Sequence, residues 1–458
     1  MKREVAARLG RRVARDPLLR AVRACSLETG VPVRLVGGLV RDAALGRAAA
    51  DVDLAAGPGC ARLVSALSAL FARRAFRFRK RGVTTWRIVL EGREVDVVDV
   101  GRRGFPADLA RRDFTVNAVA FDPVSQRLED PLRGLRDLRA GLLRAPGPAT
   151  FRDDPLRALR AARFLAAFPD WRLHRDTAAS ARAAAGAFRG TSPERVRDEL
   201  QALLLARDPG RGLRALLSLG LLPAVLPEME ATVGCAAGPL RPDVFLHTAD
   251  ALAAVSDPAP SPEEERAVLR WALLLHDVAK PETLQVRDDG RPAFHGHEIL
   301  GAERAEAVLR RLKHPRARIR RVKRLIALHL RPGHLADAGS PPRGLRRLVR
   351  DAGEDLPLLL AHAEADVRGS GGPPDRARRR RLARTLRLLR QEAGRARALG
   401  SSPLLRGEEV MRTLGLPPGP EVGAWLRAIA DAALSGEIAS REGALAWLTR
   451  RASAGGPP

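Results

Sequence analysis

The chain has 458 residues, which is enough for two to four domains with at least one large core. Hydrophobic residues make up 45% of it, but Gly and Pro interrupt the longest apolar runs and the first twenty residues contain no apolar leader, so we expect a cytoplasmic protein without a membrane span. The net charge of +27 favours a polyanionic partner only modestly, because all but five of the 80 basic residues are arginines, a bias that spreads positive charge over the whole sequence.

Strand-like segments are concentrated before residue 125, where they alternate with helical stretches. They cover 33–38, 51–56, 84–92 and 94–100. From about residue 154 onward the apolar spacing is helical, as in 155–168 and in 193–206, which Ser192 and Pro193 open as cap and first turn. This layout predicts an α+β protein in which a small head with a mixed sheet and helices precedes an all-α neck and body.

Stretches rich in Gly and Pro predict the domain boundaries. They cover 145–150, 234–243, 256–265 and 369–376. The breaks predict four parts, which are a head over 1–150, a helical neck over 151–235, a helical domain over 241–368 and a C-terminal helical region over 377–452. The last residues, 453–458, are expected to be disordered.

The stretch LVGGLVRD joins an apolar strand to a helix that begins near Leu39, with Gly37 and Gly38 between them. Glycines at such a turn let backbone amides approach a phosphate, and a helix start favours negative charge. A plain turn is the more common meaning of a Gly-Gly pair. The stretch DVDLAA strengthens the phosphate interpretation, because Asp51 and Asp53 project from one face of a strand.

Two carboxylates placed so closely repel each other unless a cation lies between them, and Mg²⁺ bound to a triphosphate suits such a pair. Asp96 in EVDVVDV is the candidate third carboxylate, because it would come from a neighbouring strand, whereas Asp99 would point to the opposite face. These three carboxylates, Asp51, Asp53 and Asp96, are the predicted catalytic group.

The segment RRDFTVN offers further groups that could bind a nucleotide. Arg111 and Arg112 could clamp phosphate oxygens, while Asp113 and Asn117 could hydrogen-bond sugar hydroxyls. An ordinary charged helix is the plainer alternative for this segment.

Four motifs in this order, GGLVRDAALGR…DVDLA, RRDFTVNAVAFD, DPLRGLRDLRAGLLR and DDPLRALRAARFLAAF, closely resemble the class II tRNA nucleotidyltransferases, which comprise the CCA-adding enzymes and bacterial poly(A) polymerases. SPERVRDELQALLL and the segment 403–426 resemble further parts of such proteins, so the resemblance spans essentially the whole chain. It implies a polymerase-β-like head and template-independent addition of C and A to the 3′ end of tRNA from CTP and ATP. Poly(A) polymerase is an alternative, and a non-catalytic RNA-binding protein is a more distant one.

The resemblance also implies roles for single residues. Asp51 and Asp53 would hold two Mg²⁺ ions that activate the RNA 3′-hydroxyl and bind the triphosphate. Asp154 and Arg157 would read the base, because an Asp accepts from the exocyclic amine of C or A and an Arg donates to the neighbouring ring acceptor. The expected nucleotide-binding set is Gly37, Gly38, Arg41, Arg112, Asp113, Asn117, Asp154, Arg157, Arg160 and Arg163.

One departure from the family bears on which nucleotides are added. Between DVVDV and RRDF this chain has only GRRGFPADLA, residues 101–110, where family members usually carry a longer flexible segment. In that family the segment is implicated in the switch from C addition to A addition. Its shortness makes a partial enzyme, which adds C alone or shares the work with a second enzyme, the main alternative to full CCA addition.

A second group of potential metal ligands lies between residues 247 and 366, and it consists of His247, the His276-Asp277 doublet in LLHDVAK, the histidines of FHGHEILGAE, His329, and Asp366 in AEADVRG. It resembles the HD phosphohydrolase domain, which implies a site for Mn²⁺, Ni²⁺ or Co²⁺. The ligands would be His247, His276, Asp277, His297, His329 and Asp366. His295 is a weaker candidate, and Lys280 could steady a substrate phosphate. A degenerate domain kept for RNA docking is the alternative.

Overall fold

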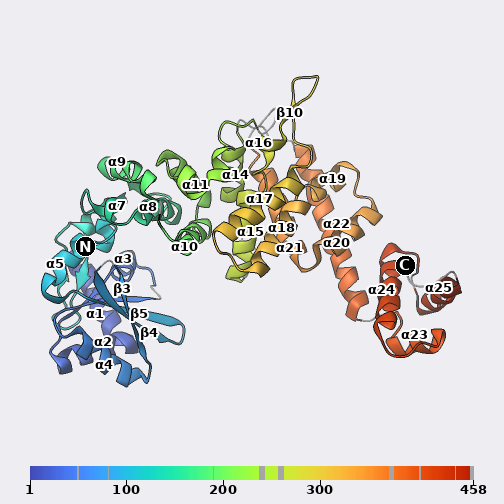
Figure 1. Cartoon of the computed structure of the whole chain (residues 1–458). Coiled ribbons are helices and arrows are strands. Elements are labelled where there is room, and N and C mark those ends of the chain that lie inside the picture. The colour runs from blue at the N-terminus through green and yellow to red at the C-terminus, as the bar shows by residue number, and fades with distance from the viewer. Residues whose placement is uncertain are drawn as a thin grey trace. The chain divides into compact units, whose positions relative to one another are not determined.

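The chain forms two compact units, Met1–Pro227 and Glu228–Pro458, which are described separately (Figure 1). The structure is a computed structural model, and it describes residues 1–48, 51–80, 82–188, 190–236, 243–255, 262–370, 376–401, 404–438 and 440–453. Parts of the predicted linkers at 234–243, 256–265 and 369–376, and nearly all of the predicted disordered end at 453–458, lie outside these residues.

A seven-stranded mixed sheet with the strand order β3-β4-β5-β2-β1-β6-β7 forms the centre of the first unit. Its strands are β1 Val33–Val36, β2 Val52–Ala56, β3 Ala75–Lys80, β4 Val83–Leu90, β5 Arg93–Asp99, β6 Ala120–Phe121 and β7 Leu128–Glu129. β2 and β5 are parallel, and the other neighbours are antiparallel. The four predicted strands are confirmed. β3 was missed because its Phe76 and Phe78 alternate with basic residues and stay exposed, unlike the apolar residues of a buried strand.

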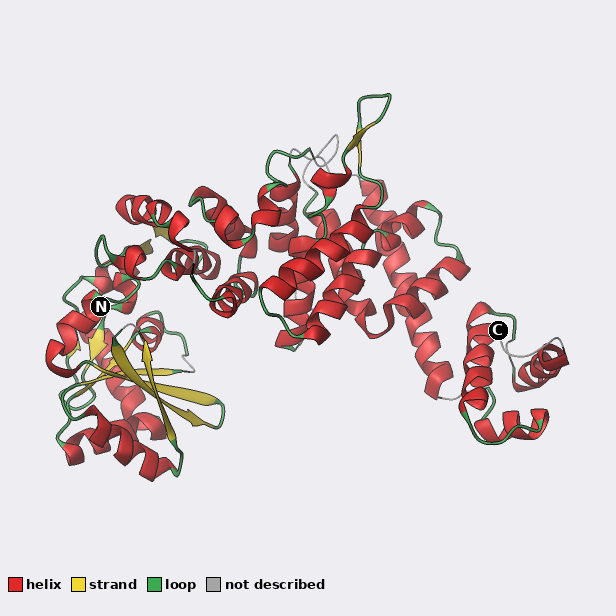
Figure 2. Cartoon of the chain, in the orientation of Figure 1, coloured by secondary structure: helices red, strands yellow, loops and turns green. Residues whose placement is uncertain are grey.

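One face of this sheet is buried against helices, and the other carries the polar residues. The helices α1 Lys2–Arg15, α2 Pro17–Thr29 and α4 Cys60–Phe71 share one apolar cluster with the sheet. Val52, Leu54 and Ala56 of β2 belong to that cluster, so the intervening Asp53 faces the other side of the sheet. Figure 2 shows these helices against the strands of the first unit.

Beyond the sheet the first unit is helical, as predicted. The remaining helices are α3 Gly38–Ala44, α5 Gly104–Ala110, α6 Gly134–Arg139, α7 Thr150–Asp153, α8 Leu156–Ala167, α9 Arg175–Ala183, α10 Pro193–Leu204, α11 Pro209–Ser218 and α12 Leu222–Val225, with a short pair of strands β8 Leu142–Leu143 and β9 Arg172–Leu173. Ser192 and Pro193 do open α10, but among the described residues the Ser192 side chain makes no capping hydrogen bond.

The second unit consists of helices and one short hairpin. The helices, from the boundary onward, are α13 Pro227–Glu230, α14 Val244–Ala254, α15 Glu263–Leu275, α16 Lys280–Thr283, α17 His297–Arg311, α18 Arg316–Leu328, α19 Arg331–Asp337, α20 Pro342–Ala352, α21 Leu356–Arg368, α22 Arg376–Ser401, α23 Gly407–Leu414, α24 Pro420–Ser435 and α25 Arg441–Ser453. The hairpin pairs β10 Gln285–Val286 with β11 Pro292–Ala293. The α+β fold class is confirmed, and no helix within the described ranges has both the length and the apolar character that crossing a membrane requires.

Candidate functional site

Two of the three predicted catalytic carboxylates lie side by side on the open face of the sheet. In the parallel pairing of β2 with β5, Asp53 is directly opposite Asp96, and in the next pairing Arg87 of β4 is opposite Asp96. The Arg87 guanidinium donates two hydrogen bonds of 2.8 Å to the Asp96 carboxylate. Asp51 precedes β2 and is exposed. Its charge, like that of Asp96, acts to raise the pKa of Asp53, so the three carboxylates form one electrostatic group.

The pKa of Asp53 is higher than usual. Burial is the main cause, and the charges of Asp96 and Asp51 add to it, while Arg112 and a hydrogen bond from the Gly38 backbone amide act in the opposite direction. A buried carboxylate among other carboxylates is stabilised by a bound cation. This chemistry fits a divalent metal at Asp51 and Asp53, whereas both oxygens of Asp96 already accept hydrogen bonds from Arg87, so its role as a third ligand stays a prediction.

The glycine turn is required by the close approach of Asp53. Gly37 has φ +70°, and a Cβ there would lie 2.5 Å from Asp53 Oδ2 and 3.1 Å from Arg112 Nη1. Gly38 is the first residue of α3 and bonds to the same carboxylate. The two glycines thus let the strand-to-helix turn contact the carboxylate directly, and their predicted contact with a phosphate stays a prediction.

Gly37→Ala is expected to lower nucleotide transfer by about a hundredfold, because the new Cβ would displace the Asp53 carboxylate and a misplacement of about 1 Å has an effect of this size. Gly30→Ala is the matched control, since Gly30 has φ +66° but no atom within 4 Å of its ideal Cβ. An alanine at either position is strained because φ is positive. Only the alanine at position 37 would also contact the Asp53 carboxylate. Initial rates for the two variants measure the difference, and equal losses would show that backbone strain alone is responsible.

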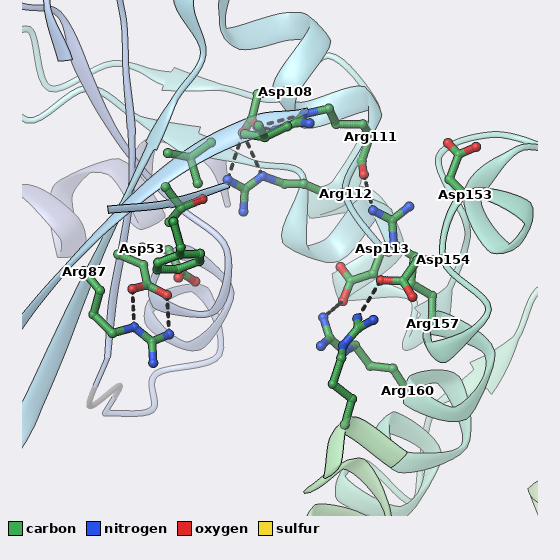
Figure 3. Close-up of a pocket in the computed structure, with 16 residues that line it drawn as sticks. Asp53, Arg87, Asp108, Arg111, Arg112, Asp113, Asp153, Asp154, Arg157 and Arg160 are labelled. Carbon is green, nitrogen blue, oxygen red and sulfur yellow. Dashed lines mark hydrogen bonds and ion pairs between the residues drawn. The ribbon is translucent and has the colours of Figure 1, made fainter. Parts of the chain in front are cut away.

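The pocket beside these carboxylates has a volume of about 710 Å³ and is lined by residues from the sheet, α5 and the neck. Figure 3 shows Asp108 between Arg111 and Arg112, and its carboxylate accepts from Arg111 Nη2 at 3.0 Å and from Arg112 Nη2 at 2.9 Å. Asp108 therefore fixes both arginines at the edge of the pocket. Arg41 does not line this pocket, because its guanidinium bonds to Asp42 and Asn117.

The predicted base-reading residues lie on the neck side of the same pocket (Figure 3). Asp154 Oδ2 accepts a 2.9 Å hydrogen bond from Arg195 of α10, a residue that the base-reading prediction did not include. Arg157 donates to the carbonyl oxygens of Thr150 and Arg111. The structure thus brings Asp154 and Arg157 into one pocket with Asp53, and their role in reading the base remains a prediction.

Two arginines of the predicted nucleotide-binding set contact carboxylates, and their binding to a nucleotide stays a prediction. Arg160 lies between Asp113 and Glu199, at 3.2 and 2.7 Å, and Arg163 Nε is 2.7 Å from Glu199. Asp113 also accepts from Asn117 at 2.9 Å, and both of these residues are buried. These contacts join the head to the neck within the first unit. Neither Glu199 nor Arg195 was predicted as part of the site. The two residues are four apart on α10 and therefore lie on the same helix face.

Asp113→Asn is expected to destabilise the first unit by about 1–3 kcal/mol at pH 7 because it removes a charged partner of Arg160. Burial alone would raise the pKa of Asp113, but Arg160, Asn117 and the Phe114 amide outweigh it and lower that pKa. Such a carboxylate stabilises the fold above its unfolded-state pKa of about 3.9, and the contribution disappears as the pH falls through the lower folded value. The free energy of unfolding of the first unit is measured by urea unfolding, with hydrogen exchange in α8 as the probe. The difference in this free energy between variant and parent should become smaller below about pH 4. A difference independent of pH would contradict this.

The second unit contains the predicted histidine site. The helices α14, α17 and α21 and the ends of α15 and α18 place their ligand atoms in two adjacent groups. The first group is His247, His276 and Asp366, and the second is Asp277, His297 and His329. In each group the ligand atoms lie within 4.8 Å of one another, so the six predicted residues converge, and their binding to a metal stays a prediction.

The hydrogen bonds of four histidines in this site prepare them for a metal. His247, His276, His297 and His329 each place Nδ1 against a backbone carbonyl, at 3.2, 2.8, 2.6 and 2.6 Å. A donated Nδ1–H fixes the tautomer in which Nε2 keeps its lone pair, which is the usual arrangement around a protein-bound metal. The Nε2 atoms of His276 and His297 are buried and face the Asp277 carboxylate, at 3.2 and 3.4 Å. These residues fit a transition metal.

Charge in this site is concentrated around Asp277. Its Oδ2 is 2.7 Å from Lys280 Nζ and 3.2 Å from His276 Nε2. Burial would raise the pKa of Asp277, but His276 and Lys280 outweigh it and hold that pKa well below its usual value. Lys280 is buried against this carboxylate, close to the position predicted for it. His295 belongs to neither ligand group.

His362 is the histidine of this site that was not predicted. It is fully buried on α21, with its ring centroid 5.2 Å from that of His276 and 5.7 Å from that of His329. Burial, together with the neighbouring His276 and His329, lowers its pKa well below the usual value. The sequence held a signal for it, because His362 precedes Asp366 by four residues, the spacing that puts two side chains on one helix face.

Comparison with protein families divides the chain into three matched regions. The Poly A polymerase head domain matches residues 33–144, the probable RNA and SrmB-binding site of polymerase A matches 170–232, and the HD domain matches 244–367. The predicted parts 1–150, 151–235 and 241–368 each contain or nearly contain one of these regions.

Similar proteins are known along nearly the full length. The chain is 40% identical over 425 residues to an A-adding tRNA nucleotidyltransferase of Deinococcus radiodurans, covering 91% of this chain and 94% of that protein. It is 33% identical to a CC-adding tRNA nucleotidyltransferase of Thermus thermophilus, covering 92% and 95%. A multifunctional CCA protein of Xanthomonas axonopodis is 35% identical but matches only 62% of this chain.

Solved structures show the same fold. The CCA-adding enzyme of Bacillus stearothermophilus in complex with CTP superposes with a TM-score of 0.63 at 25% identity, covering 96% of this chain and 98% of that one. The Thermotoga maritima CCA-adding enzyme complexed with tRNA has a TM-score of 0.64 at 20% identity, covering 96% and 97%.

Proposed function

This chain belongs to the tRNA nucleotidyltransferase family, and on that premise we propose that it adds a single A to tRNA 3′ ends that already carry two C residues. The observation that carries the proposal is the 40% identity to an A-adding enzyme over 91% of this chain. The multifunctional CCA protein of Xanthomonas axonopodis, by contrast, is similar over only 62% of it. Full CCA addition, the leading expectation from the sequence, stays the alternative, because CCA-adding enzymes of known structure match 96% of this chain at 20–25% identity.

The pocket of the first unit supports the transfer chemistry. In the reaction the tRNA 3′-hydroxyl oxygen forms a bond to the α-phosphorus of ATP, and the bond to pyrophosphate breaks. Asp51 and Asp53 would hold Mg²⁺, which supplies charge stabilisation for this step. Arg112, fixed by Asp108, points one guanidinium nitrogen toward Asp53 and would contact the triphosphate. The triphosphate would thus bind in the part of the pocket between Asp53 and Arg112.

Adenine would be read at the neck side of the pocket. The Asp154 carboxylate would accept from the exocyclic amine of adenine, and Arg157 would donate to the adjacent ring nitrogen. Guanine has an oxygen where adenine has the amine, and an N–H where adenine has the ring nitrogen. Its oxygen would face the Asp154 carboxylate, which is also an acceptor, and its N–H would face Arg157, which is also a donor. Cytosine has the same donor and acceptor order as adenine, so this pair excludes G and U but does not select A over C.

Addition of C alone is the second candidate, and the segment 101–110 favours it. This segment folds as a 3₁₀ turn, Gly101–Arg103, followed directly by α5. Asp108 within α5 is buried and bonded to both Arg111 and Arg112. A short segment held in this way leaves no long flexible loop between β5 and the arginines, which in this family is implicated in the switch to A addition.

A primer assay decides between these activities. We expect tRNA transcripts ending in two C residues to gain one nucleotide from ATP, and transcripts that lack the two C residues to gain none from CTP. Extension by CTP and not by ATP would support the C-adding candidate instead. Extension through all three nucleotides would establish full CCA addition, and long A tracts would indicate a poly(A) polymerase. Failure with every substrate would contradict the assignment of the first unit.

We further propose that the second unit is a metal-dependent phosphohydrolase. Its support is the pair of adjacent ligand groups and the buried Lys280, which lies 2.7 Å from the Asp277 carboxylate of the second group. Imidazole-rich ligands suit Mn²⁺, Ni²⁺ or Co²⁺. Plausible substrates are 2′,3′-cyclic phosphates, 2′-nucleotides and terminal phosphates of RNA. We place the protein in the cytoplasm, where tRNA and nucleoside triphosphates are available to it.

A further inference from the structure

His362 is the one residue of the histidine site whose burial the proposed ligand set does not explain. It lies on α21, four residues before Asp366, so both side chains project from the same helix face. Its exposed fraction is 0%. An apolar residue at such a position would need no hydrogen-bond partner. A buried imidazole, in contrast, is unfavourable unless its nitrogens bind a hydrogen-bond partner or a metal.

Neither ring nitrogen of His362 has a hydrogen-bond partner in the part of the chain that the structure describes. The other histidines of the site each use Nδ1 to bond a backbone carbonyl. A buried polar group without a partner destabilises the folded state, and a bound ion would remove that penalty. His362 therefore offers a lone pair that no protein donor uses.

The His362 ring lies at a distance from His276 that a shared ion would allow, although a similar spacing also separates His276 from His329, which belong to different ligand groups. Its centroid lies 5.2 Å from that of His276 and 5.7 Å from that of His329, and those two are 5.3 Å apart. Imidazoles bound to one tetrahedral ion at a metal–nitrogen distance of about 2 Å have their ring centres roughly 5 Å apart. His276 already contributes to the ligand group with His247 and Asp366.

We propose that His362 is a further nitrogen ligand of the metal centre in the second unit, in the coordination sphere that contains His276. The inference rests on the proposed metal centre but does not depend on phosphate hydrolysis. An added imidazole shifts the preference of a site toward Co²⁺, Ni²⁺ or Zn²⁺ and away from Mg²⁺. The site is thus predicted to be richer in nitrogen than the six-residue set alone would make it.

X-ray absorption of the full-length protein loaded with Ni²⁺ tests this by counting the imidazoles on the ion. His362→Gln is expected to remove one imidazole from the sphere, and His362→Leu should do the same. The matched control is His314→Gln, which alters a histidine that is also buried in the second unit but contacts Trp271 and Arg318 instead of the site. Metal affinity alone would not suffice, because losing a residue that merely supports a ligand also weakens binding about 10–100-fold.

An imidazole count unchanged in both His362 variants, in a protein that loses its ion on His276→Ala, would overturn the inference and leave the metal centre intact. If the parent protein takes up no Ni²⁺, Co²⁺ or Mn²⁺ in this unit, the metal centre and the inference both fail. Loading without any hydrolysis would remove the hydrolase proposal alone. If neither variant folds, anomalous diffraction from the Ni²⁺-loaded parent decides, since a His362 nitrogen must lie about 2 Å from the ion.

Discussion

Asp53→Asn is expected to lower nucleotide addition about a thousandfold or more while tRNA still binds. Asp53 is the carboxylate on which the site converges, because Gly37 packs against it, Gly38 bonds to it, and the charges of Arg112 and Asp96 act on its pKa. Charge stabilisation by a bound metal is worth several kcal/mol, and about 1.4 kcal/mol changes a rate tenfold. Asparagine keeps the shape of the side chain but removes the charge that would hold Mg²⁺. Single-turnover extension of tRNA with labelled ATP or CTP measures the loss.

The matched control for this prediction is Asp99→Asn. Asp99 lies on β5 of the same sheet, three residues after Asp96 and so on the opposite face, and it accepts a hydrogen bond from the Gly101 amide. Neutralising it changes the charge of the protein equally and should leave the rate within about twofold to threefold, the context-dependent spread of small local effects. An Asp53→Asn protein that extends tRNA as fast as the Asp99→Asn protein would refute the position of the catalytic centre.

Sequence periodicity was enough to predict part of the arrangement of the carboxylates. Alternation along a strand placed Asp51 and Asp53 on one face and Asp99 on the face opposite to Asp96, and the register of β2 with β5 shows that Asp53 and Asp96 lie opposite each other. The period of a strand is two whatever its surroundings, but which residues of two strands meet depends on the pairing of the strands, so Asp96 could only be named as a candidate. The same reasoning placed Asp51 beside Asp53, but Asp51 precedes the strand and is exposed.

The partners of the arginines could not be predicted in this way. Arg160 and Arg163 were predicted to bind the nucleotide, and each also lies 2.7 Å from the carboxylate of Glu199 on another helix. Which carboxylate meets which guanidinium depends on how α8 packs against α10, and that packing is set by apolar contacts all along the two helices. With so many arginines in the chain, their spacing does not distinguish those that bind carboxylates from those that bind ligands.

In the histidine site the resemblance predicted six residues whose side chains converge, and there is a physical reason why His362 was not among them. The His-Asp doublet and the dispersed histidines belong to a recognisable pattern, so six ligands were predicted and all six converge. His362 lies outside that pattern within an apolar run, where a lone histidine is usually a core residue. Its burial among other histidines becomes evident only when α21 is packed against the helices that carry His276 and His329.

His276→Ala is expected to abolish metal-dependent hydrolysis in the second unit, with a loss of at least about a hundredfold, since even supporting residues around a metal contribute 10–100-fold. Nucleotide addition by the first unit should be retained. His276 is preferred to Asp277 for this test, because removing the Asp277 carboxylate would leave the buried Lys280 without its counter-charge and cost about 3–5 kcal/mol of stability. Hydrolysis of 2′,3′-cyclic AMP and of 2′-AMP with added Ni²⁺ or Mn²⁺ is the measurement.

Two controls separate loss of the metal from loss of the fold. His334→Ala removes an exposed histidine from the same unit and should hydrolyse at the parental rate. The Asp53→Asn protein should also hydrolyse at the parental rate, because Asp53 belongs to the other unit. Each substitution should therefore remove one activity and leave the other. Unchanged hydrolysis by His276→Ala protein that contains no metal would show that the histidine site is not the source of the activity. A parent protein without any hydrolysis would instead point to a domain in which the ligand geometry is retained for RNA docking.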